Sequence, residues 1–214
     1  MKNIFLASIA RNTIDQFIKL NKLKPKNLKV AFIPTAGTPM EESLFIQEDR
    51  KKLVHLGFNV VDVNLENKNK AQLEQEMIEI DIIFVAGGNT FYLLQETLKS
   101  GFDKTIIQFI EKGGLYIGSS AGTLLAGPSI ELAKDIDNQN EALELKSYKG
   151  LNLVDFVVLP HCDDPEFKEA IEENLKTMKP KYKTIKIIDD QAVWIENENI
   201  WLIDNKHKKT LLNI

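Results

Sequence analysis

Short apolar runs alternate with longer amphipathic segments from the N-terminus to about residue 127. The runs have the length of strands and are apolar on both faces, while the segments between them repeat their apolar residues at helical spacing. Strands that are apolar throughout are typical of a parallel sheet covered by helices on both sides. We therefore predict an α/β fold built on a doubly wound, mostly parallel sheet flanked by helices.

The element boundaries follow from the same pattern. Strands are expected at residues 3–7, 28–34, 59–63, 81–86, 115–118 and 154–160. Helices are expected at residues 13–20, 40–56, 70–79, 90–99, 104–112 and 166–178. Residues 128–145 are polar and weakly periodic, which predicts a loop or short strands, and four short apolar pieces between residues 186 and 212 predict a small antiparallel meander at the sheet edge. Without a repeat or linker, the chain is expected to form a single domain over residues 1–214.

Composition limits the partners and the compartment. The chain of 214 residues has 43% hydrophobic and 27% charged residues, which is ordinary for a globular protein. A net charge of −4 gives no reason to expect binding to nucleic acid or to an anionic membrane. The single cysteine, Cys162, excludes an internal disulfide and fits a reducing compartment. Residues 1–10 match a first buried strand better than a signal sequence, so we expect a cytoplasmic protein.

Residues 118–122 read Gly-Ser-Ser-Ala-Gly and lie between an apolar run and a stretch of small residues that opens a helix. This is the strand–turn–helix setting in which G-x-S-x-G forms a nucleophile elbow. The central residue is Ser120, whose hydroxyl would be exposed to substrate, and the N–H of Ala121 at the helix start would be available to an oxyanion. The alternative interpretation is a glycine- and serine-rich loop that only packs.

A serine nucleophile needs a base, and the chain has three histidines. His55 lies near the end of a helix and His207 in a lysine-rich turn, so both are expected to be solvated. His161 follows the apolar run at 154–160, and functional groups in parallel sheets gather where strands end. We therefore predict that His161 is the base. Cys162 beside it is interpreted as a small apolar residue, and the chain has no metal-ligand motif such as H-x-x-x-H or C-x-x-C.

A second oxyanion donor is expected in the Gly87-Gly88-Asn89 turn, which follows one predicted strand and opens a helix. Glycine there allows a substrate to approach the backbone closely. The same turn would suit a phosphate, but no G-x-G-x-x-G or P-loop pattern accompanies it. A simple strand-to-helix turn is the other interpretation.

Three separate motifs together resemble one family. Residues 86–91 (Ala-Gly-Gly-Asn-Thr-Phe), the elbow at 118–122 and Pro160-His161 are similar to the S51 serine peptidases, the family of peptidase E and cyanophycinase. The resemblance extends from residues 33–36 to residues 189–192. It implies a fold like the class I glutamine amidotransferases, with Ser120 as nucleophile, His161 as general base, and Gly88 with Ala121 as oxyanion donors.

The acid that completes the triad is left open by the resemblance. A peptidase E-like arrangement favours Asp135, and Asp137 lies two residues away. A cyanophycinase-like arrangement would take the acid from residues 188–192, which offer Asp189 or Asp190.

The substrate is also left open. Peptidase E holds the aspartyl side chain with an arginine beyond the histidine, and residues 165–181 contain lysines but no arginine. Since lysine does not reproduce the planar guanidinium fork, strict aspartyl specificity is not expected to carry over. Asn89, Thr90 and Thr123 are the predicted hydrogen-bonding groups of the substrate pocket.

The predicted activity is that of a serine exopeptidase acting on dipeptides or small peptides, aspartyl ones included, through an acyl-enzyme on Ser120. No cofactor is required, and the family likeness implies a homodimer. One alternative is an esterase or amidase with the same machinery. Another is a catalytically idle protein that binds a small metabolite.

Overall fold

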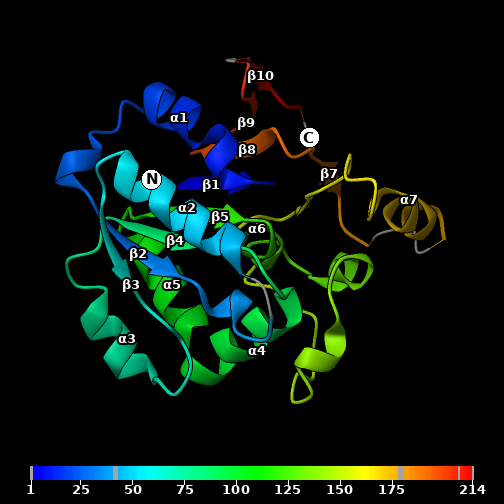
Figure 1. The fold of residues 1–214 in the computed structure, drawn as a ribbon, viewed down its shortest axis with the longest axis horizontal. Helices are drawn as coiled ribbons and strands as arrows, with labels where there is room; N and C mark the ends of the chain where they lie inside the picture. The colour runs from blue at the N-terminus through cyan, green and yellow to red at the C-terminus, as the bar shows by residue number, and fades with distance from the viewer. Residues whose placement is uncertain (1, 41–42, 178–180, 207, 214) are drawn as a thin grey trace.

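A twisted sheet with helices on both faces forms the centre of the molecule (Figure 1). The computed structural model describes residues 2–40, 43–177, 181–206 and 208–213. Within them, the main sheet has eight strands in the order β10-β9-β8-β1-β5-β4-β2-β3. These strands are β1 (Asn3–Ala7), β2 (Lys29–Ile33), β3 (Asn59–Asp62), β4 (Ile82–Val85), β5 (Leu115–Ser119), β8 (Gln191–Glu196), β9 (Asn199–Asp204) and β10 (Lys209–Leu211).

The sheet is parallel on one side and antiparallel on the other. Strands β1, β5, β4, β2 and β3 pair in parallel, whereas β8, β9 and β10 pair antiparallel and join the sheet through β1. The predicted doubly wound sheet with an antiparallel C-terminal meander is confirmed. Because β1, β5 and β4 are neighbours, the residues that follow their carboxyl ends meet at one edge.

Strands β1, β2, β4 and β5 each contribute side chains to two cores, because successive side chains of a strand point to opposite faces. In β1, Ile4 and Leu6 belong to one cluster, and Phe5 and Ala7 belong to the other. Helices α1 (Ala10–Asn21) and α2 (Leu44–His55) cover the Phe5 face (Figure 1). The Ile4 face is covered by α3 (Lys70–Glu76), α4 (Thr90–Ser100), α5 (Phe102–Glu111) and α6 (Ala121–Leu125).

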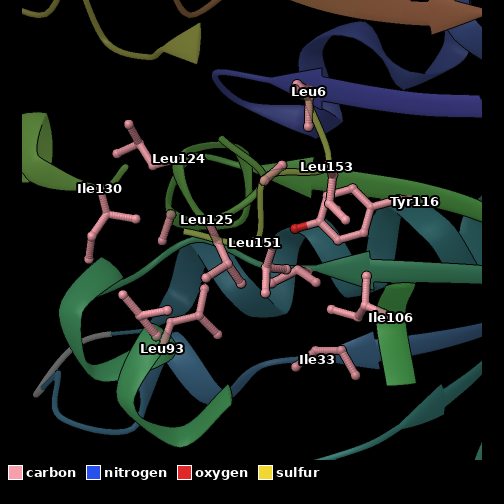
Figure 2. Packing of buried hydrophobic residues seen from close by; sticks show 14 of the residues in the cluster. Leu6, Ile33, Leu93, Ile106, Tyr116, Leu124, Leu125, Ile130, Leu151 and Leu153 are labelled. Carbon is pink, nitrogen blue, oxygen red and sulfur yellow. The ribbon is translucent and has the colours of Figure 1, made fainter. Parts of the chain in front are cut away.

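The segment after α6 differs from the prediction. Residues 128–145, predicted as a loop or short strands, hold two 3-10 helices, η3 (Glu131–Asp135) and η4 (Gln139–Glu141), and Ser129 forms an isolated bridge with Lys149. Apolar residues of this segment (Ile130, Leu132, Ala133 and Ala142) are buried in the same cluster as residues of α4 and α6, and Figure 2 shows Ile130 with Leu124 and Leu125 of α6. The segment therefore belongs to the core of the Ile4 face in spite of its polar composition.

The predicted strand at 154–160 also has a different place. It forms β6 (Val157–Leu159), which pairs in parallel with β7 (Thr184–Lys186) in a separate two-stranded sheet. The piece predicted at 186–188 is thus not part of the meander. Helix α7 (Lys168–Thr177) lies between β6 and β7.

Two predicted helices extend onto residues that the structure leaves undescribed. The first was expected over residues 40–56, and residues 41 and 42 lie outside the described ranges. The second was expected over residues 166–178, of which residue 178 lies outside them. No helix in the described part of the chain combines the length and apolar character that crossing a membrane requires.

Candidate active site

Ser120 lies in a strained turn between β5 and α6. Its backbone angles are φ 51° and ψ −106°, a region that residues with a side chain rarely adopt and that costs about 1–3 kcal/mol. The Ser120 N–H donates to the carbonyl oxygens of Ala7 and Ser8, both at 3.1 Å. The carboxyl end of β1 therefore holds the turn in place, which is the geometry expected of a nucleophile elbow.

The two glycines of the elbow are required for space. A Cβ at Gly118 would lie 2.6 Å from the carbonyl group of Gly122, and a Cβ at Gly122 would lie 2.3 Å from the carbonyl oxygen of Val85. The start of α6 therefore packs directly on the backbones of β5 and β4. This close approach allows the chain to turn within one residue.

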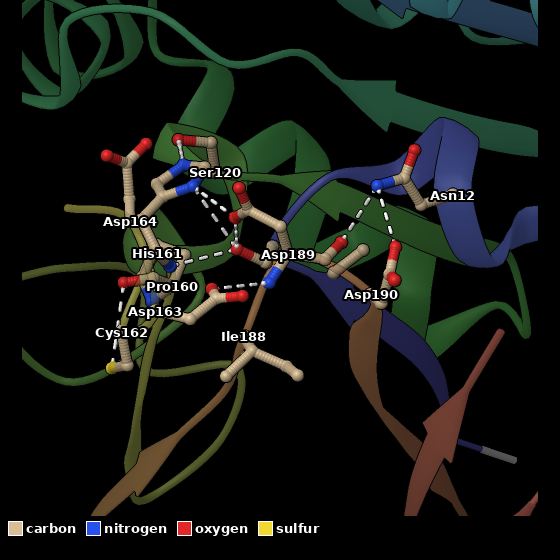
Figure 3. Close-up of polar contacts among 12 residues, drawn as sticks. Asn12, Ser120, Pro160, His161, Cys162, Asp163, Asp164, Ile188, Asp189 and Asp190 are labelled. Carbon is tan, nitrogen blue, oxygen red and sulfur yellow. Dashed lines mark hydrogen bonds and ion pairs between the residues drawn. The ribbon is translucent and has the colours of Figure 1, made fainter.

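His161 contacts the serine from the segment that follows β6 (Figure 3). Its Nε2 lies 2.8 Å from Ser120 Oγ. His161 follows β6 and has a left-handed backbone with φ 58°, and the next residue donates its N–H to the Ile187 carbonyl at 3.1 Å. The predicted pair of Ser120 and His161 is thus brought to hydrogen-bond distance.

The acid on the other imidazole nitrogen is Asp189. Its Oδ1 lies 2.6 Å from His161 Nδ1, and Figure 3 shows the carboxylate beside the ring. Burial by itself raises the pKa of Asp189, but the hydrogen bond and charge of His161 and the hydrogen bond from Ser8 bring that pKa below its ordinary value. The carboxylate is therefore held in its charged form, as a group that stabilises an imidazolium must be.

The preference for Asp135 among the candidate acids is corrected by this contact, because His161 Nδ1 has Asp189 as its partner. Asp135 ends η3, and its side chain lies outside what the structure describes. Asp190 accepts from Asn12 Nδ2 at 3.1 Å. Asp137 accepts the N–H of Thr90 at 2.9 Å. The last two therefore have other partners than the His161 ring.

Ser8 is a residue of the site that the sequence analysis missed. It accepts the His161 backbone N–H at 2.9 Å, and its Oγ–H donates to Asp189 Oδ1 at 2.8 Å. The side chain is fully buried. Ser8 directly follows β1, so the rule that led to His161 also applies to it: polar residues gather at the carboxyl ends of parallel strands.

The loop after β4 lies against the elbow and carries Gly88, one of the two predicted oxyanion donors. A Cβ at Gly87 would be 3.2 Å from Ser120 Cβ. Gly88 has φ 132°, and a Cβ there would lie 2.3 Å from the Ala36 carbonyl oxygen, so the position requires glycine. The N–H of Asn89 donates to that oxygen at 2.8 Å. Gly88 lines the pocket with Ser120, and Ala121 begins α6.

The three side chains predicted to bind substrate form hydrogen bonds within the protein instead, which corrects that prediction. Asn89 caps α4 by accepting the Tyr92 N–H at 2.9 Å, and its amide donates to the Asn138 carbonyl at 2.8 Å. The Thr90 hydroxyl donates to Asp137. The Thr123 hydroxyl donates to the Ala7 carbonyl at 2.7 Å. None of the three is among the residues that line the pocket.

A pocket of about 270 Å³ opens beside Ser120 and His161. This volume is just under the roughly 300–1,000 Å³ of pockets for drug-sized ligands, so it suits a small molecule. Apolar side chains supply much of the lining, and the charged side chains in it besides His161 are Arg11, Asp49 and Asp137. Arg11, at the start of α1, is a pocket residue that the sequence analysis does not predict, since the family resemblance points to an arginine beyond His161.

The remaining candidates do not enter the site. His55 is exposed at the end of α2, and His207 lies outside the described residues. Cys162 is partly buried, and its thiol hydrogen-bonds the Leu159 carbonyl at 3.4 Å. In the part of the chain that the structure describes, no three His, Cys, Asp or Glu side chains form a group suited to a metal ion.

An elbow serine, a histidine and a partly buried aspartate in hydrogen-bonded succession define a hydrolase-type site. The model of peptidase family S51 matches residues 6–203, and the chain belongs to this family. An uncharacterized peptidase of Listeria monocytogenes is 34% identical over 94% of this chain and 97% of its own length. Peptidase E of a Nostoc species is 26% identical over 96% of this chain and 87% of its own length.

The fold agrees with this assignment. A crystal structure of a Listeria monocytogenes protein provisionally assigned as a peptidase E superposes with a TM-score of 0.87, at 32% identity and with all of both chains covered. A peptidase structure from an acI-B1 actinobacterium shares the fold with a TM-score of 0.65 at 16% identity. The names of these relatives and the family together support a peptidase.

Proposed function

We propose that this protein is a serine exopeptidase that hydrolyses dipeptides or small peptides through an acyl-enzyme on Ser120. The observation that carries the proposal is the unbroken succession Ser120 Oγ, His161 and Asp189, with contacts of 2.8 Å and 2.6 Å. A small pocket at the nucleophile supports a small substrate.

The geometry supports the following sequence of proton transfers. His161 Nε2 accepts the Ser120 proton while Ser120 Oγ attacks the scissile carbonyl carbon. Asp189 holds the Nδ1 proton and stabilises the imidazolium that forms. His161 then protonates the leaving amine, which departs with its bond to the carbonyl carbon broken. Water, deprotonated by His161, hydrolyses the acyl ester and restores Ser120.

The N–H groups of Gly88 and Ala121 are the proposed oxyanion donors. Both belong to backbone that packing holds in place, Gly88 against Ala36 and Ala121 at the start of α6. Donors held in advance stabilise the developing charge without reorganisation, and one such donor contributes roughly 10²–10³-fold in rate.

The test combines covalent labelling with turnover. A fluorophosphonate is expected to label wild-type protein, with the adduct mapped to Ser120 and not to Ser119 by mass spectrometry. A dipeptide panel is expected to show turnover that Ser120→Ala lowers by roughly 10⁶-fold in kcat. Full activity of Ser120→Ala would refute the acyl-enzyme. Turnover of short acyl esters but of no peptide would replace the peptidase with an esterase, and binding without labelling would indicate an idle homologue.

A further inference from the structure

Apolar side chains make up a large part of the wall of the pocket beside Ser120. Its lining includes five apolar side chains from segments far apart in the chain: Ile9, Met40, Phe45, Ile136 and Phe167. Two of them are aromatic, and such side chains contribute large apolar contact areas. An apolar substrate group gains free energy by leaving water for such a surface, whereas a charged group loses its hydration.

The cation in this lining, Arg11, already has two acidic partners. Its Nε lies 3.3 Å from Glu48 Oε2, and its Nη1 lies 3.2 Å from Asp49 Oδ1. Asp49 is buried and also accepts from Ser119 Oγ at 3.1 Å. The guanidinium of Arg11 is therefore already paired with two carboxylates before any substrate binds. An acidic substrate side chain placed near Arg11 would be repelled by these carboxylates.

Asp137 is in the opposite situation. It lines the same pocket, and both of its hydrogen bonds, from the N–H and the hydroxyl of Thr90, end on Oδ2. Among the described residues, its Oδ1 has no hydrogen-bond partner and the carboxylate forms no salt bridge. Burial raises the pKa of Asp137, although the Thr90 hydrogen bonds and the His161 ring act against the rise. A carboxylate oxygen that is open at a pocket wall can pair with a cationic ligand, and such a ligand would favour the charged form of Asp137.

The covalent geometry of a peptide indicates which cationic group of a substrate would lie near Asp137. In the N-terminal residue of a substrate, the α-nitrogen lies about 2.5 Å from the carbonyl carbon, given bonds of about 1.5 Å and an angle near 111°. The group that binds this nitrogen must therefore line the same small pocket as the nucleophile. Asp137 does so together with Ser120 and His161.

We propose that Asp137 binds the free α-ammonium group of the substrate and that the pocket takes an uncharged, apolar side chain on that N-terminal residue. This inference rests on the proposed peptidase function and narrows its substrates to peptides with a free N-terminus and a non-acidic first residue. It makes Asp137 a specificity-determining residue, while Ser120, His161 and Asp189 perform the chemistry.

The first half of the test removes one partner of the proposed ion pair at a time, the ammonium group by acetylating the substrate and the carboxylate by mutating Asp137. Leu-Leu and N-acetyl-Leu-Leu are hydrolysed by wild type, Asp137→Asn and, as a matched control, Asp103→Asn in the first turn of α5. Acetylation is expected to lower kcat/KM about 100-fold for wild type and for the control, because it removes the charged hydrogen bond to Asp137. In Asp137→Asn the ratio should fall below about 10, with the change mainly in KM.

The second half compares Leu-Leu, Asn-Leu and Asp-Leu, whose first side chains have similar size and branching. Wild type is expected to prefer Leu, then Asn, and to hydrolyse Asp-Leu about 10-fold more slowly than Asn-Leu, as one unfavourable charge contact of about 1.4 kcal/mol predicts. Preference for Asp-Leu over Asn-Leu would overturn the apolar assignment. Equal turnover of free and acetylated Leu-Leu by wild type would overturn the ammonium site even if Asp137→Asn did not fold.

Failure of the proposed peptidase function can be distinguished from failure of the proposed substrate preference. If Ser120 takes up a fluorophosphonate and some peptide is hydrolysed, the peptidase stands and only the substrate preference is judged by these ratios. If neither occurs, the proposed function is refuted, and the substrate preference with it.

Discussion

The nucleophile and its base are held by two different kinds of structure. Ser120 follows a central strand of the eight-stranded sheet, and glycines at 118 and 122 pack it against backbone. His161 follows a strand of a separate two-stranded sheet, and Asp189 lies in the segment before β8. The first part is fixed by packing, while the second is fixed largely by hydrogen bonds. Mutations in the two parts should therefore damage different properties.

The largest expected effect is on activity and concerns the acid. Asp189→Asn should lower kcat by roughly 10⁴-fold, because an amide at this place favours the wrong imidazole tautomer. Thermal stability should change far less than activity does. Steady-state kinetics on a dipeptide, together with thermal unfolding, checks both statements.

Two matched variants make this test specific. Asp190→Asn changes the neighbouring carboxylate, which is bonded to Asn12, and Asp135→Asn changes the acid that the resemblance favours. Both should keep activity near that of wild type. A loss in Asp135→Asn as large as that in Asp189→Asn would show that the acid of the working enzyme is not the one seen here.

The second effect is on stability and concerns the elbow. Gly122→Ala places a Cβ 2.3 Å from the Val85 carbonyl oxygen, so the free energy of unfolding should fall by about 2–3 kcal/mol. Gly113→Ala is the control, since its Cβ meets nothing within 4 Å and only the positive φ of 92° is unfavourable. That variant should lose about 1 kcal/mol. Urea unfolding measures both, and equal losses would mean that backbone conformation, not space, explains the glycine.

The same division explains what the sequence could predict. Alternating apolar runs and helices identify the parallel sheet, and the spacing of Gly118, Ser120 and Gly122 identifies the elbow, because both signals are local. The strand-end argument predicts His161 near Ser120, and the structure has the two side chains in contact although β6 lies outside the main sheet. An apolar run of that length predicts a strand, but it does not tell which of the two sheets the strand joins.

The acid and the pocket depend on contacts between distant segments, which the pattern does not contain. Asp189 and His161 are 28 residues apart, and several aspartates are equally plausible by spacing. Asn89 and Thr90 were assigned to the substrate because polar residues at a strand end favour a site, but Asn89 caps α4 and Thr90 binds Asp137. Helix caps and site residues have the same composition at a helix start.

A smaller effect is expected at Ser8, which joins the two parts of the site. Ser8→Ala removes the donor to Asp189 and the acceptor of the His161 N–H. We expect kcat to fall about 10- to 100-fold with KM little changed, because a hydrogen bond to a charged group contributes about 1.5–3 kcal/mol. Ser100→Ala is the matched control, a buried serine bonded to the Glu96 carbonyl at 2.7 Å in α4. A rise in KM alone would assign Ser8 to substrate binding instead of positioning.

The smallest expected effect is a difference in pH dependence between two aspartates, one from each part. The pKa of Asp189 is below its ordinary value of 3.8, so the stability from this group is present above that value and is lost as the pH falls through the lowered pKa. Burial raises the pKa of Asp49, against the charge and hydrogen bonds of Arg11 and Ser119, so its contribution is present below 3.8 and is lost as the pH rises through the raised pKa.

Removing each carboxyl should therefore change the slope of stability against pH in opposite directions. Across about pH 2 to pH 6, Asp189→Asn should flatten the rise of the melting temperature with pH below about pH 4, and Asp49→Asn should make the slope more positive above about pH 4. Thermal unfolding of both variants, with Asp190→Asn as the control, measures these slopes across this range. A constant difference in melting temperature from wild type is not counted, because each substitution also removes hydrogen bonds. Slopes that move in the same direction would contradict the division, since they would mean that both carboxylates are stabilised by folding, the one behind the nucleophile included.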